Sequence, residues 1–170
     1  MDILDIKARV AEAVVESIFR RARYKLTPYA RSGAAPVLRI GREDFTPDFT
    51  AAQTAETRGE ASPGPPQSFL IGVKYRSQLG QYLAIEGQRG ERSAFAQAKR
   101  LWPALCFVFV TDRPDPGRSW FQVLDLSGHS AAAPVRTLDL AEHGGLAIWR
   151  ANVDDHEELA RRIFALLTGV

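Results

Sequence analysis

The chain has 170 residues, 45% of them apolar and 25% charged, which is typical of a globular protein with one domain and its own core. The net charge of +2 does not by itself indicate a polyanionic partner, and the single cysteine, Cys106, excludes an intrachain disulfide framework. No run approaches the ~18 apolar residues of a membrane-spanning helix. Charges also interrupt the N-terminal stretch, where a signal peptide would be apolar, so we expect a cytoplasmic protein with no membrane partner.

The first third of the chain predicts one long helix followed by short strands. Apolar residues recur with helical spacing over about residues 3–24. The segments PVLRIG (36–41) and PDFTAAQ (47–53) each predict a short strand, with a turn at 42–45 between them. Residues 54–67 are rich in glycine, proline and polar residues and predict an exposed loop.

The segment SFLIGVKYRS (68–77) predicts a buried strand that carries a lysine. Because side chains alternate between the faces of a strand, its residues divide into two sets. The first set is Phe69, Ile71, Val73 and Tyr75, and the second is Leu70, Gly72, Lys74 and Arg76. The second set places a lysine beside a glycine with no neighbouring carboxylate to balance its charge.

The next predicted elements alternate between helix and strand. Residues 92–102 predict a helix that stops near Pro103. The apolar run at 104–112 predicts a central strand covered on both faces, in which Cys106 is an inert buried thiol. Residues 119–126 predict a following strand at the edge of the sheet.

The C-terminal part of the chain gives a weaker signal. Residues 127–150 have no clear assignment, although LAIWRA (146–151) is compatible with a short strand. A helix over about residues 154–167 ends the chain, with Asp154 or Asp155 as its expected N-cap. The predicted fold class is α/β, with a mixed central sheet flanked by helices in a single domain over residues 1–170.

The order of these elements resembles the PD-(D/E)XK nuclease superfamily. A helix with a glutamate, a strand opened by Pro47-Asp48, a strand ending in V-K-Y-R, a helix and the strand FVFVTD follow one another over about residues 8–126. The resemblance implies a restriction-endonuclease-like fold, with this core and the helix at 154–167. It also implies hydrolysis of nucleic-acid phosphodiesters with magnesium, which prefers oxygen ligands.

The resemblance assigns roles to individual residues. Asp48 and Lys74 match the catalytic positions, and Asp48 with Glu16, or less favourably Glu12, matches the metal ligands. Each residue also has a structural alternative. Asp48 could simply begin a strand, Lys74 could extend its head into water from a packed stem, and Glu16 could pair with Arg20 one turn on.

Two further residues are candidates for substrate binding. Arg76 follows the lysine on the same face of the strand, where it could contact phosphate. Gln78 and Tyr82 are similar to a Q-x-x-x-Y element of some nucleases in this superfamily. Exposed surface positions explain these residues equally well.

Gly72 departs from the superfamily's pattern, because it occupies the position of the motif's second acidic residue. Three explanations remain open. The site is inactive and the domain is a binding module; the acid has moved to Glu86, Glu43 or Asp44; or the glycine is an introduced change.

Basic residues concentrate in residues 7–31 and 74–100. If the fold brings these segments together, they form a basic surface for nucleic acid; otherwise they are solvated helix faces. The sequence therefore favours an impaired or atypical nuclease, and the alternative is an inactive module that binds nucleic acid or protein. A homodimer paired through the strand at 119–126 is a third possibility.

Overall fold

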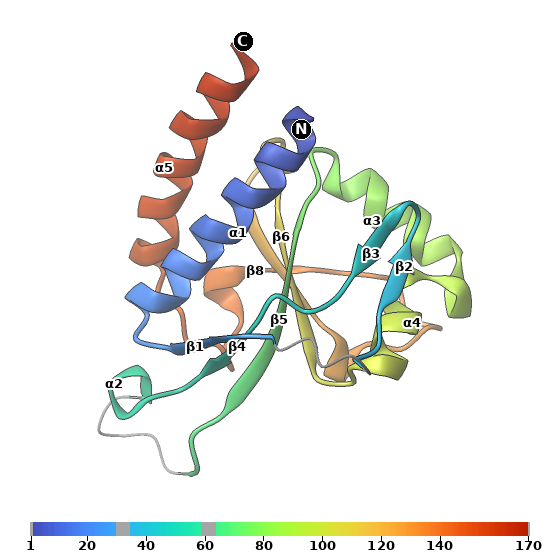
Figure 1. The fold of residues 1–170 in the computed structure, drawn as a ribbon, viewed down its shortest axis with the longest axis horizontal. Coiled ribbons are helices and arrows are strands. Elements are labelled where there is room, and N and C mark those ends of the chain that lie inside the picture. The colour runs from blue at the N-terminus through green and yellow to red at the C-terminus, as the bar shows by residue number, and fades with distance from the viewer. Residues whose placement is uncertain (1, 30–34, 59–63, 170) are drawn as a thin grey trace.

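The computed structural model describes residues 2–29, 35–58 and 64–169, which form five α-helices and eight strands (Figure 1). The helices are α1 (Ile3–Arg21), α2 (Ala55–Arg58), α3 (Leu79–Gln88), α4 (Ala94–Leu101) and α5 (Arg150–Thr168). The strands are β1 (Lys25–Pro28), β2 (Leu38–Ile40), β3 (Glu43–Phe45), β4 (Phe49–Ala52), β5 (Ser68–Tyr75), β6 (Leu105–Val110), β7 (Phe121–Asp125) and β8 (Leu138–Asp139).

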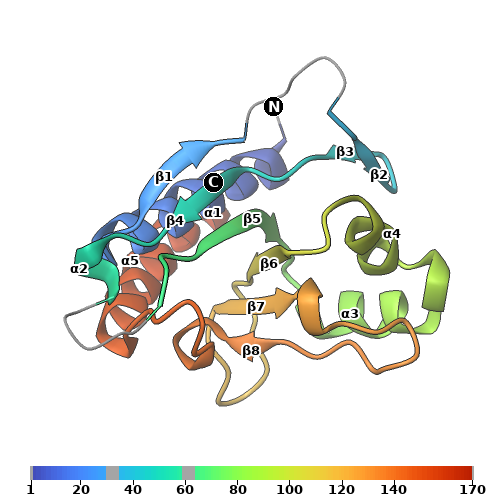
Figure 2. The ribbon, with the colours of Figure 1, turned by 90° about the horizontal axis from the view of Figure 1, so that it is seen from below.

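Six strands form one mixed sheet in the order β1-β4-β5-β6-β7-β8 (Figure 2). The pair β5–β6 is parallel and the other four pairs are antiparallel. A parallel pair needs a crossover connection, which α3 and α4 supply here. Strands β2 and β3 form a separate antiparallel hairpin beside the sheet. The predicted fold class, a mixed sheet flanked by helices, is therefore confirmed.

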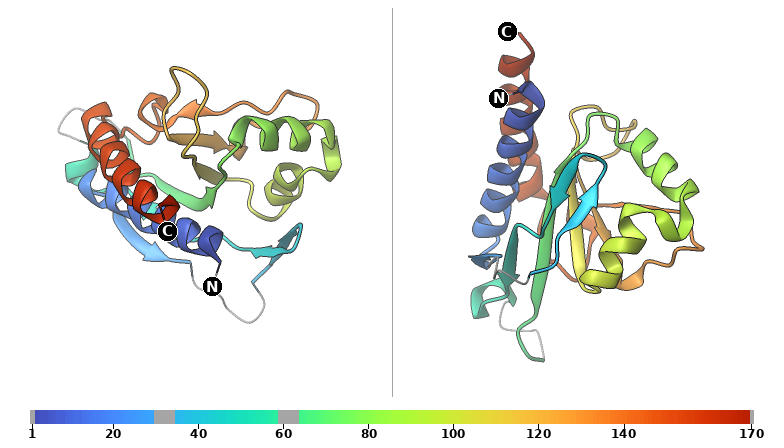
Figure 3. Two further views of the ribbon diagram at one scale, coloured as in Figure 1. Left: turned by 90° about the horizontal axis from the view of Figure 1, so that it is seen from above. Right: turned by 45° about the vertical axis from the view of Figure 1, so that its right-hand side comes forward.

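The helices cover the two faces of the sheet as separate layers: α1 and α5 lie on one side, and α3 and α4 on the other (Figure 3). The predicted alternation along β5 accounts for this arrangement. Ile71 and Val73 belong to the core beneath α1 and α5. Gly72 and Lys74 pair in register with Phe107 and Phe109 of β6, whose rings face α3 and α4. Strand β6 is buried along its whole length, as its apolar run predicted.

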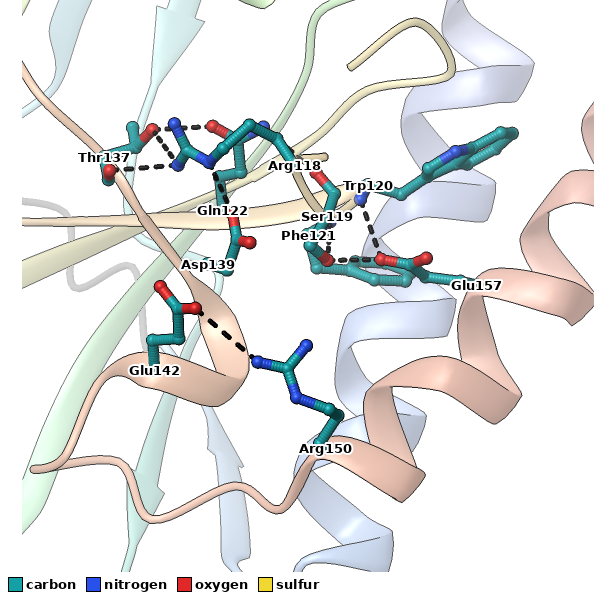
Figure 4. A network of polar contacts seen from close by, with 10 residues as sticks. All are labelled: Arg118, Ser119, Trp120, Phe121, Gln122, Thr137, Asp139, Glu142, Arg150 and Glu157. Carbon is teal, nitrogen blue, oxygen red and sulfur yellow. Dashed lines mark hydrogen bonds and ion pairs between the residues drawn. The ribbon is translucent and has the colours of Figure 1, made fainter. Parts of the chain in front are cut away.

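Helix α5 lies along α1, and polar groups connect the two helices inside the core (Figure 1). The Asn152 side chain donates a hydrogen bond to the backbone oxygen of Ile18 at 2.9 Å, and Ser17 bonds to the His156 ring at 2.9 Å. Glu157 connects α5 to the start of β7, because its carboxylate accepts a hydrogen bond from the Trp120 amide at 2.8 Å (Figure 4).

Several predicted elements are confirmed with shifted ends. Helix α1 ends three residues before the predicted position, and the helix predicted at 92–102 is α4. The expected exposed loop at 54–67 contains the short helix α2, and its residues 59–63 lie outside the described residues.

Four local predictions are wrong. The expected turn at 42–45 contains β3, which pairs with β2. The strand β7 is not at the edge of the sheet, because β8 pairs with it. Residues 146–151 form no strand. Helix α5 begins at Arg150 after Trp149 as the N-cap, four residues before the expected start.

Within the part of the chain that the structure describes, no helix is both long and apolar enough to cross a membrane.

Candidate active-site groove

The candidate site lies where β4 separates from β5. The two strands pair only as far as Phe49 and Ile71. Just beyond, the Asp48 amide donates to the Ile71 oxygen at 2.8 Å, and the Asp48 carboxylate accepts a hydrogen bond from the Val73 amide at 2.6 Å. The side chain thus replaces the next bond of the ladder, and the chain before it turns away into the β2–β3 hairpin.

A groove of about 430 Å³ opens at this separation, between the first half of α1, strand β3 and the C-terminal end of β5. Its charged lining consists of Asp5, Glu12, Glu43, Asp44, Lys74 and Arg76. Four acidic residues against two basic ones give this lining a net charge of −2 when all are ionised. The groove is therefore an acidic cleft with cations on one wall, which suits a positive ion better than a bare polyanion.

Gly72 is covered by the hairpin. A Cβ atom added at Gly72 would lie 2.6 Å from Cζ of Phe45 and 3.5 Å from Cδ1 of Leu105. Phe45 is buried and packs at 5.7 Å from the ring of Trp102, so its ring has little freedom to move aside. The space that a side chain at position 72 would need is therefore filled by an aromatic ring.

The same hairpin brings a carboxylate to the lysine. The Lys74 ammonium lies 3.1 Å from Oε2 of Glu43 and 5.0 Å from the centroid of the Phe45 ring. The Glu43 carboxylate also pairs with Arg76 at 3.6 Å. Although burial alone would raise the pKa of Glu43, Lys74 and Arg76 hold it below its usual value.

Asp48 and Glu12 have the opposite electrostatic character. Burial raises the pKa of Asp48 to about 6; the Val73 amide opposes this rise, and the negative charge of Glu12 adds to it. Burial also raises the pKa of Glu12, although Arg9 and Lys74 lower it in part. A carboxyl with a pKa near 6 changes charge near neutral pH, as catalytic carboxyls often do.

Asp48 is not among the residues that line the groove, but it lies close enough to Glu12 for the charge of Glu12 to raise its pKa, and these two carboxylates with water are the donor set for a magnesium or manganese ion. All candidate ligands are carboxylate oxygens, which these ions prefer, and a cation would relieve the repulsion between Asp48 and Glu12. Across residues 2–29, 35–58 and 64–169, no three His, Cys, Asp or Glu side chains lie close enough together to hold a metal ion. A closed metal site, of the kind that zinc occupies, is therefore not formed by these residues.

Of the other predicted site residues, some line the groove and some do not. Glu16 does not line it and pairs with Arg20 at 3.4 Å, as the structural alternative predicted. Glu86 is buried and accepts a hydrogen bond from the Ala94 amide, so it caps α4 and cannot supply the missing acid. Asp44 lines the groove, and Gln78 is exposed at the N-cap of α3.

A buried ion pair next to Tyr75, which lines the groove, was not predicted. Lys7 lies 2.9 Å from Asp112 and donates to the Tyr75 hydroxyl at 3.3 Å. Burial alone would lower the pKa of Lys7, but these two hydrogen bonds raise it. Since Lys7 precedes the buried Ala11 by four residues, its place on the apolar stripe of α1 was the available signal.

The two basic segments do not form one surface. The first lies on α1 and β1, and most of the second lies on α3 and α4, on the opposite face of the sheet (Figure 3). Arg31 lies outside the described residues. Many of the arginines are also paired with acids, including Arg21 with Asp155 and Arg100 with Glu91.

Comparisons with known protein families, with curated proteins and with solved structures find no significant match to the chain.

Proposed function

We propose that the protein is an atypical member of the PD-(D/E)XK superfamily that hydrolyses phosphodiester bonds in nucleic acid with a divalent metal ion. In this proposal Glu43 supplies the carboxylate beside Lys74 that the motif's second acid would have supplied, while Asp48 and Glu12 hold the metal ion. The observation that carries the proposal is the 3.1 Å contact between Glu43 and Lys74, made by the same hairpin that places Phe45 over Gly72. The motif's acid is absent at position 72, and the carboxylate of Glu43 contacts the same lysine from another strand.

The order and pairing of the elements support this assignment. A helix, α1, is followed by the antiparallel strands β1, β4 and β5 and then by a helical crossover to the parallel strand β6. Apart from β1, which the sequence did not predict, this is the order of elements on which the resemblance to the superfamily rests.

The raised pKa of Asp48 also supports the proposal. Burying a carboxyl whose pKa is about 6 destabilises a protein at neutral pH, because its ionised form is disfavoured in the fold. Such a group is more often found at a functional site than at a purely structural one.

The residues have distinct roles in the proposed reaction. Asp48 and Glu12 would hold magnesium or manganese, which when bound polarises the phosphoryl oxygen and makes hydroxide available. Lys74 stabilises negative charge as it grows on the phosphate, and Glu43 fixes the direction of the ammonium. Arg76, on the same wall of the groove, contacts a neighbouring phosphate oxygen.

A second candidate function is an inactive module with a nuclease-like fold that binds nucleic acid or a protein. The observation in its favour is that Glu43 already balances the charges of Lys74 and Arg76, while Phe45 closes the position of the motif's second acid. A groove in this state could retain a ligand without cleaving it.

A nuclease assay with magnesium or manganese on single-stranded, duplex and branched DNA and on RNA tests the two candidates. We expect wild type to cleave at least one substrate, and Lys74→Ala, Glu43→Gln and Glu12→Gln each to lower the rate by about 100-fold or more. The matched control is Glu16→Gln, one turn from Glu12, which should retain activity because Glu16 pairs with Arg20.

The outcomes separate the candidates. Cleavage that survives Glu43→Gln but not Lys74→Ala would contradict the replacement of the missing acid by Glu43. No cleavage of any substrate by a folded wild-type protein would reject the enzyme and leave the inactive module. The folded state of each variant is checked by its melting temperature.

A further inference from the structure

A second pocket, of about 340 Å³, lies on the other side of the turn that joins β5 to α3. It is formed by the first turn of α3, the loop between β6 and β7, and the segment before β8. Three arginines line it, Arg113, Arg118 and Arg136, with one acid, Asp115. The lining residues sum to +2, and Asp139, which pairs with Arg118 outside the lining, reduces the charge at the pocket to +1.

Arg118 is the fixed member of this set (Figure 4). Its Nε donates to Asp139 at 2.8 Å, and its Nη2 donates to the Thr137 oxygen at 3.0 Å and to the Thr137 hydroxyl at 3.1 Å. Thr137 is in turn bonded to the buried Gln122 side chain at 2.6 Å. The guanidinium is held in one orientation at the pocket wall, so little entropy is lost when it binds an anion.

Arg113 and Arg136 carry the uncompensated charge. Both are exposed, and neither side chain makes a hydrogen bond or ion pair with any described residue. Asp115 lies over the first turn of α3, with a carboxylate oxygen 3.4 Å from the Cβ position of Gly80. That helix end is therefore already occupied by a carboxylate, and the capacity to bind an anion comes from the arginines.

The pocket and the groove adjoin. Ser77 lines the groove and Leu79 lines the pocket, so the two walls are at most about 7 Å apart along the chain. Gln78 lies exposed between them. This short connection is the basis for placing one strand of nucleic acid across both sites.

We infer that this arginine pocket binds a backbone phosphate of a nucleic-acid strand and holds the strand across the groove. The inference rests on the proposed function and specifies how its substrate is held. Planar guanidinium groups form paired hydrogen bonds with phosphate oxygens, and the open pocket admits a polymer as well as a free ion. Since the groove itself is acidic, this pocket supplies the positive charge that a polyanionic substrate requires.

The test is the fluorescence anisotropy of a short labelled single-stranded DNA with the full chain, in a chelator that prevents cleavage, over a series of salt concentrations. We expect Arg113→Ala/Arg136→Ala to reduce the slope of log affinity against log salt by about 1.4, and affinity by roughly 10- to 30-fold near 0.1 M salt. Arg92→Ala/Arg162→Ala removes the same charge from exposed positions outside the pocket and should change neither value appreciably.

Three results would overturn the inference. These are absence of DNA binding by wild type, an unchanged slope in the pocket variant, and an equal loss in both double variants, which would mean that net charge alone is responsible. A further outcome would assign the pocket to a small anion instead. In that case inorganic pyrophosphate would displace DNA from wild type but not from the pocket variant, and the pocket variant would bind DNA as tightly as wild type. The binding assay does not require cleavage, so a protein that fails to cleave nucleic acid can still confirm the inference. If wild type cleaves nucleic acid but the pocket variant binds DNA as wild type does, only the role of the pocket is rejected.

Discussion

Alanine in place of Gly72 tests whether the Phe45 ring excludes a side chain at position 72. The added Cβ would lie 2.6 Å from Phe45 Cζ, which is closer than non-bonded carbons approach, so the ring and its hairpin must shift. Phe45 is 3% exposed and packs against Phe107 with ring centroids 5.0 Å apart, so a shift of its ring must disturb this packing.

The expected magnitude follows from two opposing effects. Overpacking a tight core costs about 1–3 kcal/mol, whereas replacing glycine by alanine returns about 0.4–1 kcal/mol through the unfolded state. We therefore expect Gly72→Ala to lower the free energy of unfolding by roughly 0–2.6 kcal/mol. In a Phe45→Ala background the contact is absent, and the same change should be neutral or slightly stabilising.

Urea denaturation of wild type, both single variants and the double variant gives the coupling energy, which should be about 1–3 kcal/mol. Gly144→Ala is the control, because a Cβ added there meets no atom within 4 Å. Additivity of the two changes within about 0.5 kcal/mol would refute the reasoning, since the ring would then not be what excludes a side chain at position 72.

Three further predictions concern buried ionisable groups. The contribution of Asp48 to the free energy of unfolding should fall as the pH rises from about 4 through about 6, because its carboxyl ionises at a higher pH in the fold than in the unfolded chain. Asp48→Asn should flatten this dependence and add at most about 3 kcal/mol at pH 8, measured by urea denaturation; a loss there would contradict it. Lys7→Met should lower the free energy of unfolding by about 3–5 kcal/mol, because it leaves the Asp112 carboxylate without its cation. Adding Asp112→Asn should recover much of that loss. Equal stabilities of the single and double variants would count against the importance of the ion pair. Cys106, whose pKa burial raises to about 12, should react with Ellman's reagent only after unfolding, and rapid reaction of the native protein would disprove its burial.

The parts of the fold predicted from sequence are those with a strong local pattern. The run at β6 and the alternation along β5 follow from burial on both faces. Strands β3 and β8 lack such a pattern: β3 has one apolar residue, Phe45, and β8 has two residues in all. These strands form because a partner strand and a packed ring stabilise them, and neither is visible in a local window.

The candidate site divides in the same way. The placement of Gly72 and Lys74 on one face followed from strand parity and is confirmed by the register with β6. Choosing Glu43 among the possible acids required knowing that a hairpin 31 residues earlier crosses β5 at the lysine. Likewise, Glu12 rather than Glu16 lines the groove because of the rotation of α1 on the sheet, which the sequence pattern fixed only to within a turn.

The packing of α1 against α5 has a consequence for how the chain is synthesised. The hydrogen bond between Ile18 and Asn152 joins residues 134 positions apart, so α1 leaves the ribosome long before the helix that covers it exists. At typical elongation rates this interval is on the order of 10 s. Throughout it, β1 and β5 can cover part of α1, but the side that packs on α5 has no cover, and we expect a chaperone that recognises amphipathic segments to bind the nascent chain there.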